Sequence, residues 1–230
     1  MKRGQFYFAV LLLGLASFYA GHLFVTSRHA PAVHPLTGRP IAGIATNRAW
    51  LDRATREQEE SPDRALELIG VHPGMVVADV GAGTGYMTIR LARLVGADGR
   101  VYATDVQPAM LRVIQTKAEA EHLANIQIVQ GTEVDAGLPR DAIDLALLVD
   151  VYHELGHPRE ILQSLRRSLR PEGHLVLIEY RKEDRNLPIA PTHRMSIAEA
   201  RMEVEAEGFR FDRLVSELPR QHILVFSVAR

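Results

Sequence analysis

The chain begins with an apolar run and then changes to short alternating patterns of apolar and polar residues. Residues 6–25 contain no Asp, Glu, Lys or Arg, and the flanking charges are Arg3 and Arg28. About 20 apolar residues in a helix reach across the hydrocarbon core of a bilayer. A cleaved signal peptide is the alternative, although its apolar core is usually shorter. We therefore expect a hydrophobic helix within residues 1–26, serving as a membrane anchor or as a signal segment.

The next segment, residues 27–47, shows no clear periodicity. It contains three prolines and two glycines. This composition is typical of a linker or an extended arm. We therefore expect the folded domain to span residues 48–230.

Within that domain, helical and strand-like patterns alternate. The predicted helices span residues 48–60, 62–69 (with Ser61 as the cap), 85–95, 107–122, 158–169 and 196–208. The predicted strands span residues 75–80, 100–105, 126–130, 143–150, 174–180, 209–216 and 221–228, with a turn at 170–173. Residues 143–150 are almost entirely apolar, as in strands that are covered on both faces. The alternation predicts an α/β fold with a mainly parallel sheet.

A glycine-rich stretch, DVGAGTG at residues 79–85, follows the first predicted strand and opens a helix. Glycines allow a tight turn and let a ligand approach the main chain, and the next helix points free N–H groups at that ligand. Asp105 ends the second predicted strand, where a carboxylate can accept both hydroxyls of a ribose. Together these features predict a nucleoside cofactor.

The spacing of the glycines indicates which cofactor this is. Dinucleotide-binding folds prefer G-x-G-x-x-G, and their helix N–H groups face a pyrophosphate. Here the pattern is G-x-G-x-G, and Asp79 stands two residues before the first glycine. This carboxylate would repel a pyrophosphate but suits an amino group and a sulfonium. We therefore predict S-adenosylmethionine, and a nicotinamide oxidoreductase is disfavoured.

Several motifs resemble those of the class I S-adenosylmethionine-dependent methyltransferases, in particular the type 11-like group of small-molecule enzymes. The motifs are VVADVGAGTGYMT, Asp105, Gly131-Thr132-Glu133, LALLVDVYHEL and HPREILQSLRRSLRPEGHLVLIEY, and the likeness covers roughly residues 60–228. It implies a Rossmann-like, doubly wound sheet of seven strands with the last strand antiparallel. Glu172 departs from the family, which usually has glycine at that turn. The cofactor-binding residues implied are Asp79, Gly81, Ala82, Gly83, Gly85, Asp105, Val106, Gln107, Thr132, Glu133 and Asp150.

The stretch HELGH, residues 153–157, matches the H-E-x-x-H pattern of zinc proteases. That pattern needs one helix, so that both histidines share a face. Here a predicted strand ends just before it, and Pro158 disfavours helical geometry at His157. Glu179 could be named as a third ligand, but it belongs to a neighbouring predicted strand. We therefore predict a strand-to-helix loop with no metal site, and a zinc hydrolase is disfavoured.

The same loop should lie beside the transferred methyl group. His153 or Glu154 could act as a general base for an acceptor that carries a proton. Tyr152 could hold the sulfonium against its ring. The alternative for His153 and Glu154 is a packed, hydrogen-bonded loop. The candidates for binding an anionic substrate are Tyr180, Arg181 and His193, whose alternative is a solvated surface.

Composition excludes several classes of protein. The chain has no cysteine, which excludes disulfides, thiolate zinc sites and iron–sulfur clusters. Beyond residue 30 the chain has 24 basic and 28 acidic residues. This mildly acidic balance does not suit nucleic-acid binding, which needs a basic surface. We therefore expect no nucleic-acid partner, and the sequence indicates no oligomeric state.

We therefore predict a methyltransferase that uses S-adenosylmethionine, acts on a small-molecule or lipid-like acceptor and is tethered to a membrane through residues 6–25. The alternative is a non-catalytic cofactor-binding or interaction module at the membrane. Positive charge lies on both sides of the apolar run, with a slight excess before it. This excess weakly favours a cytosolic N-terminus with the domain outside. Signal cleavage would instead give a secreted or periplasmic protein. Because S-adenosylmethionine is made in the cytosol, an outward-facing domain would need another supply of cofactor.

Overall fold

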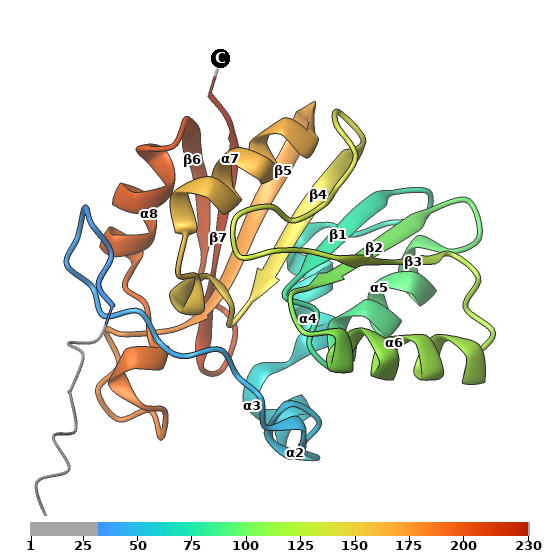
Figure 1. Ribbon diagram of the computed structural model, residues 1–230. Helices are drawn as coiled ribbons and strands as arrows, with labels where there is room; N and C mark the ends of the chain where they lie inside the picture. The colour runs from blue at the N-terminus through green and yellow to red at the C-terminus, as the bar shows by residue number, and fades with distance from the viewer. Residues whose placement is uncertain (1–31, 230) are drawn as a thin grey trace, which may run out of the picture. The chain divides into compact units, whose positions relative to one another are not determined.

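A seven-stranded mixed sheet forms the centre of the protein in the computed structural model, which describes residues 32–229 (Figure 1). The strand order is β3-β2-β1-β4-β5-β7-β6. The strands are β1 (Val76–Val80), β2 (Arg100–Asp105), β3 (Ile126–Gln130), β4 (Ile143–Val149), β5 (Leu169–Tyr180), β6 (Phe209–Val215) and β7 (Gln221–Val228). The sheet is parallel except for β7, which runs antiparallel to both β5 and β6. This confirms the predicted seven-stranded sheet and its antiparallel last strand.

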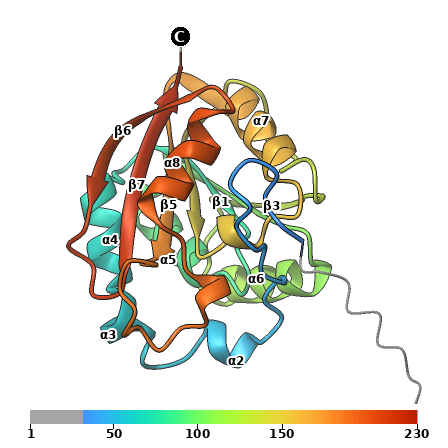
Figure 2. The same ribbon diagram turned by 90° about the vertical axis from the view of Figure 1, so that its left-hand side faces the viewer.

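Helices cover both faces of this sheet (Figures 1 and 2). The α-helices are α2 (Arg48–Leu51), α3 (Arg56–Glu60), α4 (Pro62–Ile69), α5 (Tyr86–Val95), α6 (Pro108–Ala120), α7 (Pro158–Ser168) and α8 (Ile197–Glu205), and the 3₁₀ turns are η1 (Tyr152–Glu154) and η2 (Pro191–His193). One apolar core joins α7 and α8 to the sheet, and another joins α4 and α5 to it. Burial on both faces explains why the central strands are almost entirely apolar.

The order in which strands are added to the sheet changes side between the parallel neighbours β1 and β4. From β1 the chain moves outward through β2 to β3, and it then returns to place β4 on the other side of β1. At such a switch point, the connections leave the carboxyl ends of neighbouring strands in opposite directions and open a crevice. The fold therefore places a binding site where β1 and β4 end.

Two predicted boundaries differ from the structure near residues 48–61. The predicted helix at 48–60 is two short helices, and Arg53 between them lies 3.9 Å from the centre of the Trp50 ring. This break lets Arg53 turn inward to contact Glu60. Ser61 precedes α4 as predicted, but it has a positive φ of 51° and its side chain makes no capping hydrogen bond.

The predicted turn at residues 170–173 is instead an irregular part of β5. Ile143 pairs with Leu169, whereas Leu145 pairs with His174, so β5 carries extra residues opposite β4. Gly173 is needed in this bulge, because a Cβ there would lie 2.8 Å from the backbone oxygen of Ile143. The apolar flanks predicted the strand, but the register shift has no local signature.

Residues 32–47, which we name the strap, lie against the domain (Figure 1, blue). The Arg39 guanidinium is buried and contacts the buried Glu203 carboxylate of α8 at 3.0 Å and 3.2 Å. The strap also pairs with the loop after β4, since the Ala42 N–H donates to the His153 carbonyl at 3.1 Å. We predicted a linker or an extended arm here; in the strap, residues 33–40 form a turn closed by an antiparallel bridge between Val33 and Pro40, and the segment packs on the domain rather than forming a free linker.

The predicted hydrophobic helix at residues 6–25 lies outside the described residues. Within residues 32–229, none of the helices combines the length and the apolar character that a bilayer crossing requires.

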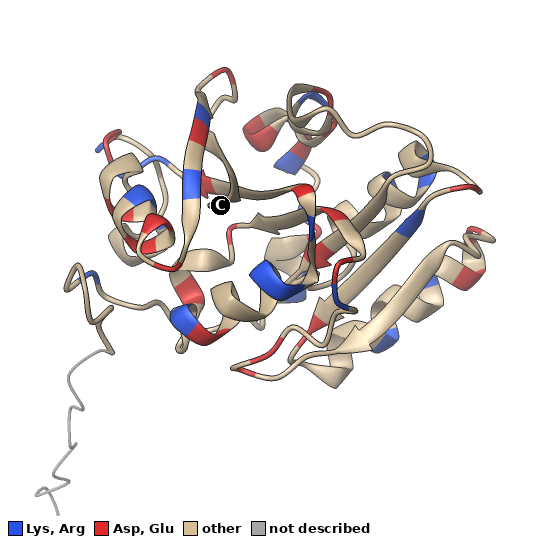
Figure 3. Ribbon diagram, turned by 90° about the horizontal axis from the view of Figure 1, so that it is seen from above, with Lys and Arg blue, Asp and Glu red and all other residues tan. Residues whose placement is uncertain are grey.

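Basic and acidic residues are interspersed along the described helices and strands (Figure 3). Several form ion pairs between neighbouring elements, such as Arg90 with Asp63 at 3.1 Å. The absence of a nucleic-acid partner stays a prediction.

Candidate active site

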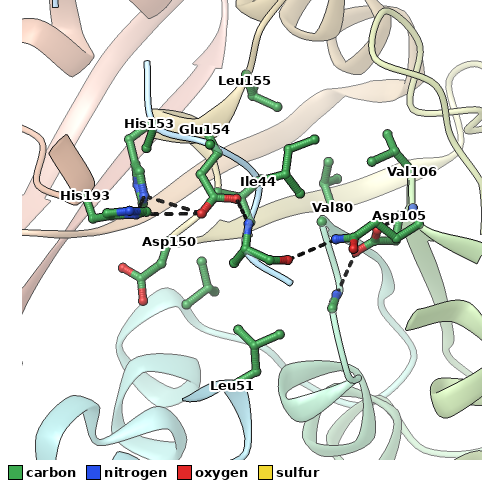
Figure 4. A pocket seen from close by; sticks show the side chains of 18 of the residues that line it. Ile44, Leu51, Val80, Asp105, Val106, Asp150, His153, Glu154, Leu155 and His193 are labelled. Carbon is green, nitrogen blue, oxygen red and sulfur yellow. Dashed lines mark hydrogen bonds and ion pairs between the residues drawn. The ribbon is translucent and has the colours of Figure 1, made fainter. Parts of the chain in front are cut away.

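A cavity of about 710 Å³ opens at the switch point between β1 and β4 (Figure 4). Its floor comes from the residues that follow β1, β2 and β4, and the strap forms one wall. The predicted site residues that line it are Gly81, Gly83, Asp105, Val106, Gln107, Thr132, Glu133, Asp150, His153, Glu154, Tyr180 and His193. The fold therefore brings most of the predicted residues to one cavity, while their individual roles stay predictions.

The glycine loop after β1 is fastened to the end of β2. The Gly81 N–H donates to the Thr104 carbonyl at 2.8 Å, and the Gly83 N–H donates to Asp105 Oδ2 at 2.9 Å. Gly81 has a φ of +72°, and a Cβ there would lie 2.7 Å from the Val151 side chain. The loop therefore requires glycine both for its backbone conformation and for its close approach to the segment after β4.

Asp105 lies at the centre of these contacts. Its Oδ1 accepts from the Gln107 N–H at 2.8 Å. Burial raises the pKa of Asp105, and the backbone N–H groups of Gln107 and Gly83 oppose that rise. The carboxylate therefore lies at the edge of the cavity with a fixed orientation.

A second buried group of charges lies where β4 ends. Asp150 has a positive φ of 54°, and its Oδ2 accepts from the Gln221 amide at 2.7 Å. Its Oδ1 is buried and has no partner among the described residues. Burial, followed by the charges of Glu60 and Glu179, raises the pKa of Asp150 well above its usual value. An orphaned carboxylate oxygen beside a cavity is a ready acceptor for a ligand N–H.

Two neighbours of Asp150, Arg56 and Glu60, were not predicted from the sequence. Arg56 and Glu60 both line the cavity, and Arg56 Nε donates to Glu60 Oε2 at 2.7 Å. The Tyr180 hydroxyl donates to Glu60 Oε1 at 2.7 Å. The only local signal was the i, i+4 spacing of Arg56 and Glu60, which is also common on exposed helices.

A third polar group joins the loop after β4 to the loop that contains η2. His153 Nε2 lies 3.1 Å from His193 Nδ1. The other ring nitrogen of His153, Nδ1, lies 2.6 Å from Glu179 Oε2. The backbone N–H of Ala45 in the strap donates to Glu154 Oε2 at 3.0 Å. Figure 4 shows His153, Glu154 and His193 together at one end of the cavity.

The pKa values of this group follow from burial and from neighbouring charge. Burial is the largest single effect and would lower the pKa of His153, but the charge and hydrogen bond of Glu179, together with the charges of Asp150 and Glu154, outweigh it and the pKa is raised. Burial raises the pKa of Glu154. Burial and then the neighbouring His153 lower the pKa of His193.

Five predicted residues do not line the cavity, namely Asp79, Ala82, Gly85, Tyr152 and Arg181. Asp79 is buried behind the glycine loop and accepts from the Thr88 hydroxyl at 2.5 Å. Ala82 packs with Leu111 and Ile114 on α6, and Gly85 has a φ of +82° just before α5. These three residues shape the loop from behind.

For Tyr152 and Arg181, the structure corrects the proposed ligand contacts. Tyr152 is fully buried in the core, so its ring cannot hold the sulfonium. The Arg181 guanidinium donates to backbone carbonyls of the β6–β7 connection and β7, including those of Leu218 at 3.0 Å and Gln221 at 3.2 Å. Arg181 therefore stabilises that connection rather than binding an anionic substrate.

The two histidines of HELGH lie in different elements, as expected for the predicted strand-to-helix loop. His153 belongs to η1, and His157 is the residue before α7. His157 faces Glu133, with Nε2 and Oε2 3.8 Å apart, and is half exposed. The two histidines therefore do not form the helical pair of a zinc protease.

Comparisons with known proteins agree with this geometry. Residues 71–215 match a family model described as methyltransferase domain. The ubiquinone/menaquinone biosynthesis C-methyltransferase UbiE of Ectopseudomonas mendocina is 32% identical over 118 residues, covering 51% of this chain and 46% of that protein. UbiE of Teredinibacter turnerae is 32% identical, covering 53% and 49%. This chain thus spans about half the length of these relatives.

One solved structure is similar to this chain over most of the length of both chains. An S-adenosylmethionine-dependent methyltransferase from Aquifex aeolicus superposes with a TM-score of 0.74 and 29% identity, covering 78% of this chain and 96% of that one. The match with the family model extends from just before β1 to the end of β6 and includes the glycine loop, Asp105 and the loop after β4. The chain therefore belongs to the methyltransferase domain family.

Proposed function

We propose that this enzyme methylates a small apolar acceptor that carries a ring hydroxyl, of the quinol kind. The observation that supports this most directly is the composition of the cavity wall beyond the cofactor residues. Apolar side chains line it from separate segments, including Ile41 and Ile44 of the strap, Leu155 after η1 and Ile189 before η2. Such a wall favours an apolar acceptor, because it would leave the polar groups of a hydrophilic one unpaired.

The described residues fit S-adenosylmethionine in the other part of the cavity. Gly81 and Gly83 leave room for a ligand against the main chain, and Asp105 can accept hydrogen bonds from ribose hydroxyls. We assign the orphaned Asp150 Oδ1 to the ligand's ammonium group and the Arg56 guanidinium to its carboxylate. The cofactor supplies the methyl group on a positively charged sulfur, and the residues of the chain orient it and exclude water.

The acceptor's reacting end belongs at the polar end of the cavity. A reduced quinol ring has electron-rich carbons beside its hydroxyls, whereas an oxidised quinone ring is electron-poor. As the ring gains a methyl group on carbon, it must lose a proton. His153, Glu154 and His193 are the groups placed there to handle that proton. The UbiE relatives, named for ubiquinone and menaquinone biosynthesis, support this acceptor class.

A membrane location would suit such an acceptor. We propose, from the sequence of residues 6–25, that this segment holds the enzyme at a bilayer into which an apolar acceptor partitions. Reporter enzymes fused after residue 230 test the orientation. Activity of a reporter that works only outside the cytosol would support the outward-facing domain that the charge bias favours. Activity of a cytosolic reporter would mean that the domain faces the cytosol, where S-adenosylmethionine is made.

A labelled-methyl assay on the full chain tests the acceptor class. The protein is incubated with methyl-labelled S-adenosylmethionine and either a reduced or an oxidised short-chain quinone, and the products are identified by mass spectrometry. We expect label on a ring carbon of the reduced form. Label on polar amines or thiols, and none on any quinol, would contradict the proposed acceptor.

A pair of variants tests the cavity wall. Ile189→Lys places a charge in the apolar wall and should lower kcat/KM for the quinol while leaving the affinity for S-adenosylhomocysteine unchanged. Leu94→Lys makes the same change at an exposed position on α5 and serves as the control. Equal effects of both variants would show that the wall does not select the acceptor.

A further inference from the structure

Three side chains at the polar end of the cavity present potential metal ligands to a common point. The atoms are His153 Nε2, His193 Nδ1 and Glu154 Oε1. The two nitrogens lie 3.1 Å apart, and the Glu154 oxygen lies 3.9 Å from His153 Nε2 and 3.7 Å from His193 Nδ1. Ligands on a tetrahedral Zn²⁺ with bonds of about 2.0–2.1 Å lie roughly 3.3 Å from one another. A shift of about half an ångström by Glu154 would therefore give a metal-binding geometry.

Contacts outside this triad orient two of the three ligands. Glu179 Oε2 lies 2.6 Å from His153 Nδ1, which orients the ring so that Nε2 faces the other ligands. A carboxylate behind a histidine in this way is a recurrent feature of metal sites. The strap holds the other oxygen of Glu154 through the Ala45 N–H at 3.0 Å. The ligand atoms are therefore arranged before any metal arrives.

The local charge balance favours a positive charge between these residues, which either a proton on His153 or a metal ion would supply. The Glu179 side chain is fully buried, and that of Glu154 is only 10% exposed. Within the described part of the chain, neither carboxylate pairs with a lysine or an arginine. Buried charges are usually paired with opposite charge or coordinated to a metal. A divalent cation between the two histidines and Glu154 would balance both carboxylates.

We propose that His153, Glu154 and His193 bind one divalent transition-metal ion of the Zn²⁺ class. Two imidazoles and one carboxylate suit such ions, whereas Mg²⁺ and Ca²⁺ prefer oxygen ligands. All three residues line the cavity, so the remaining coordination position faces the acceptor. With the metal bound, these three residues would act on the proton through the ion rather than accept it themselves. The metal would bind the acceptor's hydroxyl oxygen and ease the loss of its proton to solvent. This role rests on the proposed function, whereas the metal site itself does not.

This site uses only part of the HELGH motif. His157 points away toward Glu133, and His193 comes from 40 residues further along the chain. The sequence argument against a helical zinc-protease site remains valid, but we revise its conclusion that no metal binds. His157 offers a matched control, since it is a histidine of the same loop that contributes no ligand.

Titration of the metal-stripped full chain tests the site without any acceptor. Zn²⁺ binding is measured by calorimetry, and Co²⁺ binding is followed by the visible absorption that a tetrahedral site produces. We expect one ion per chain. His193→Ala and Glu154→Ala should abolish this binding, and Glu179→Gln should weaken it by roughly 10–100-fold because it disturbs only the orientation of His153. His157→Ala should bind as the wild type does.

Each other outcome would overturn the proposal. A folded protein that binds no metal has no such site, and binding that survives His193→Ala is adventitious. The affinity for S-adenosylhomocysteine, measured for every variant, should be unchanged and shows that each variant has folded. Because the titration contains no quinol, a failure of the acceptor proposal would leave the metal result intact, and the reverse also holds.

Discussion

At the scale of single residues, Asp105 offers the most direct test of cofactor binding. Its oxygens accept from the Gln107 and Gly83 N–H groups. Asp105→Ala removes both contacts and the acceptor for the ribose. Hydrogen bonds to a charged group contribute about 1.5–3 kcal/mol, so we expect the Kd for S-adenosylhomocysteine to rise about 10- to 150-fold. Calorimetry measures the change.

Asp98→Ala is the control for this prediction, because Asp98 is an exposed residue on the turn after α5. The control should leave the Kd unchanged. An Asp105→Ala variant that binds as tightly as the wild type would show that the ribose site lies elsewhere.

Asp79 gives a prediction about pH. Burial raises its pKa to about 6, from an ordinary value of 3.8. Because the folded state favours the protonated form, Asp79 stabilises the fold below about pH 4, and this contribution is lost as the pH rises through 6. At pH 8 the buried carboxylate costs on the order of 3 kcal/mol relative to the neutral group.

Asp79→Asn stays neutral at every pH and keeps an oxygen for the Thr88 hydroxyl. We expect the variant to equal the wild type near pH 4 and to be more stable than it near pH 8. Urea unfolding of both proteins at pH 4, 6 and 8 measures the difference. A difference that does not change with pH would mean that Asp79 does not titrate in this range.

Predictions from the sequence were more successful for residues that belong to a motif with regular spacing. They were less successful where they required knowing which way a side chain points. The glycine loop and Asp105 were found because their spacing follows from strand and helix geometry. Tyr152 was wrongly predicted to face the cofactor because it lies in a short 3₁₀ turn. In so short an element, no periodicity of apolar residues indicates which side chain enters the core. Arg56 was missed because a charged helical residue is usually exposed, and its burial depends on Glu60 and the distant Tyr180.

At the scale of elements, the strap is held in part by a buried ion pair between Arg39 and Glu203, which His34 and Thr37 of the strap also contact. The Arg39 guanidinium and the Glu203 carboxylate are almost wholly buried. Arg39→Met leaves Glu203 buried without its partner, and breaking such a pair costs about 3–5 kcal/mol. We expect a loss of this size in the free energy of unfolding, measured in urea.

Two further variants make that test specific. Arg64→Met removes an arginine whose ion pairs with Glu67 and Glu217 are exposed, and it should cost less than about 1 kcal/mol. Adding Glu203→Leu to Arg39→Met should recover much of the loss, because no uncompensated charge remains. If the double variant were no more stable than Arg39→Met, the loss would come from packing rather than from charge.

The sheet strands were predictable because burial on both faces leaves long apolar runs, as in residues 143–150. The strap was not predictable, because two of its three buried residues, His34 and Arg39, are polar. Arg39 is buried only because Glu203 lies 164 positions along the chain on α8. A pattern read within one segment cannot reveal such a pair, so the segment resembled a linker.

At the scale of the whole molecule, the cavity joins both halves of the sheet. Its walls come from the ends of β1 and β2, from the end of β4, from α3 and from the strap. A bound cofactor would contact all of these, so it should stabilise the domain as one unit. At a concentration 100 times its Kd, S-adenosylhomocysteine should add about 2.7 kcal/mol to the free energy of unfolding and raise the Tm by roughly 5–10 °C. Scanning calorimetry should show one transition that moves as a whole in the wild type and moves by about half as much or less in Asp105→Ala at the same ligand concentration. Two transitions, only one of which moves, would mean that the two halves of the sheet unfold separately and that the cavity does not couple them.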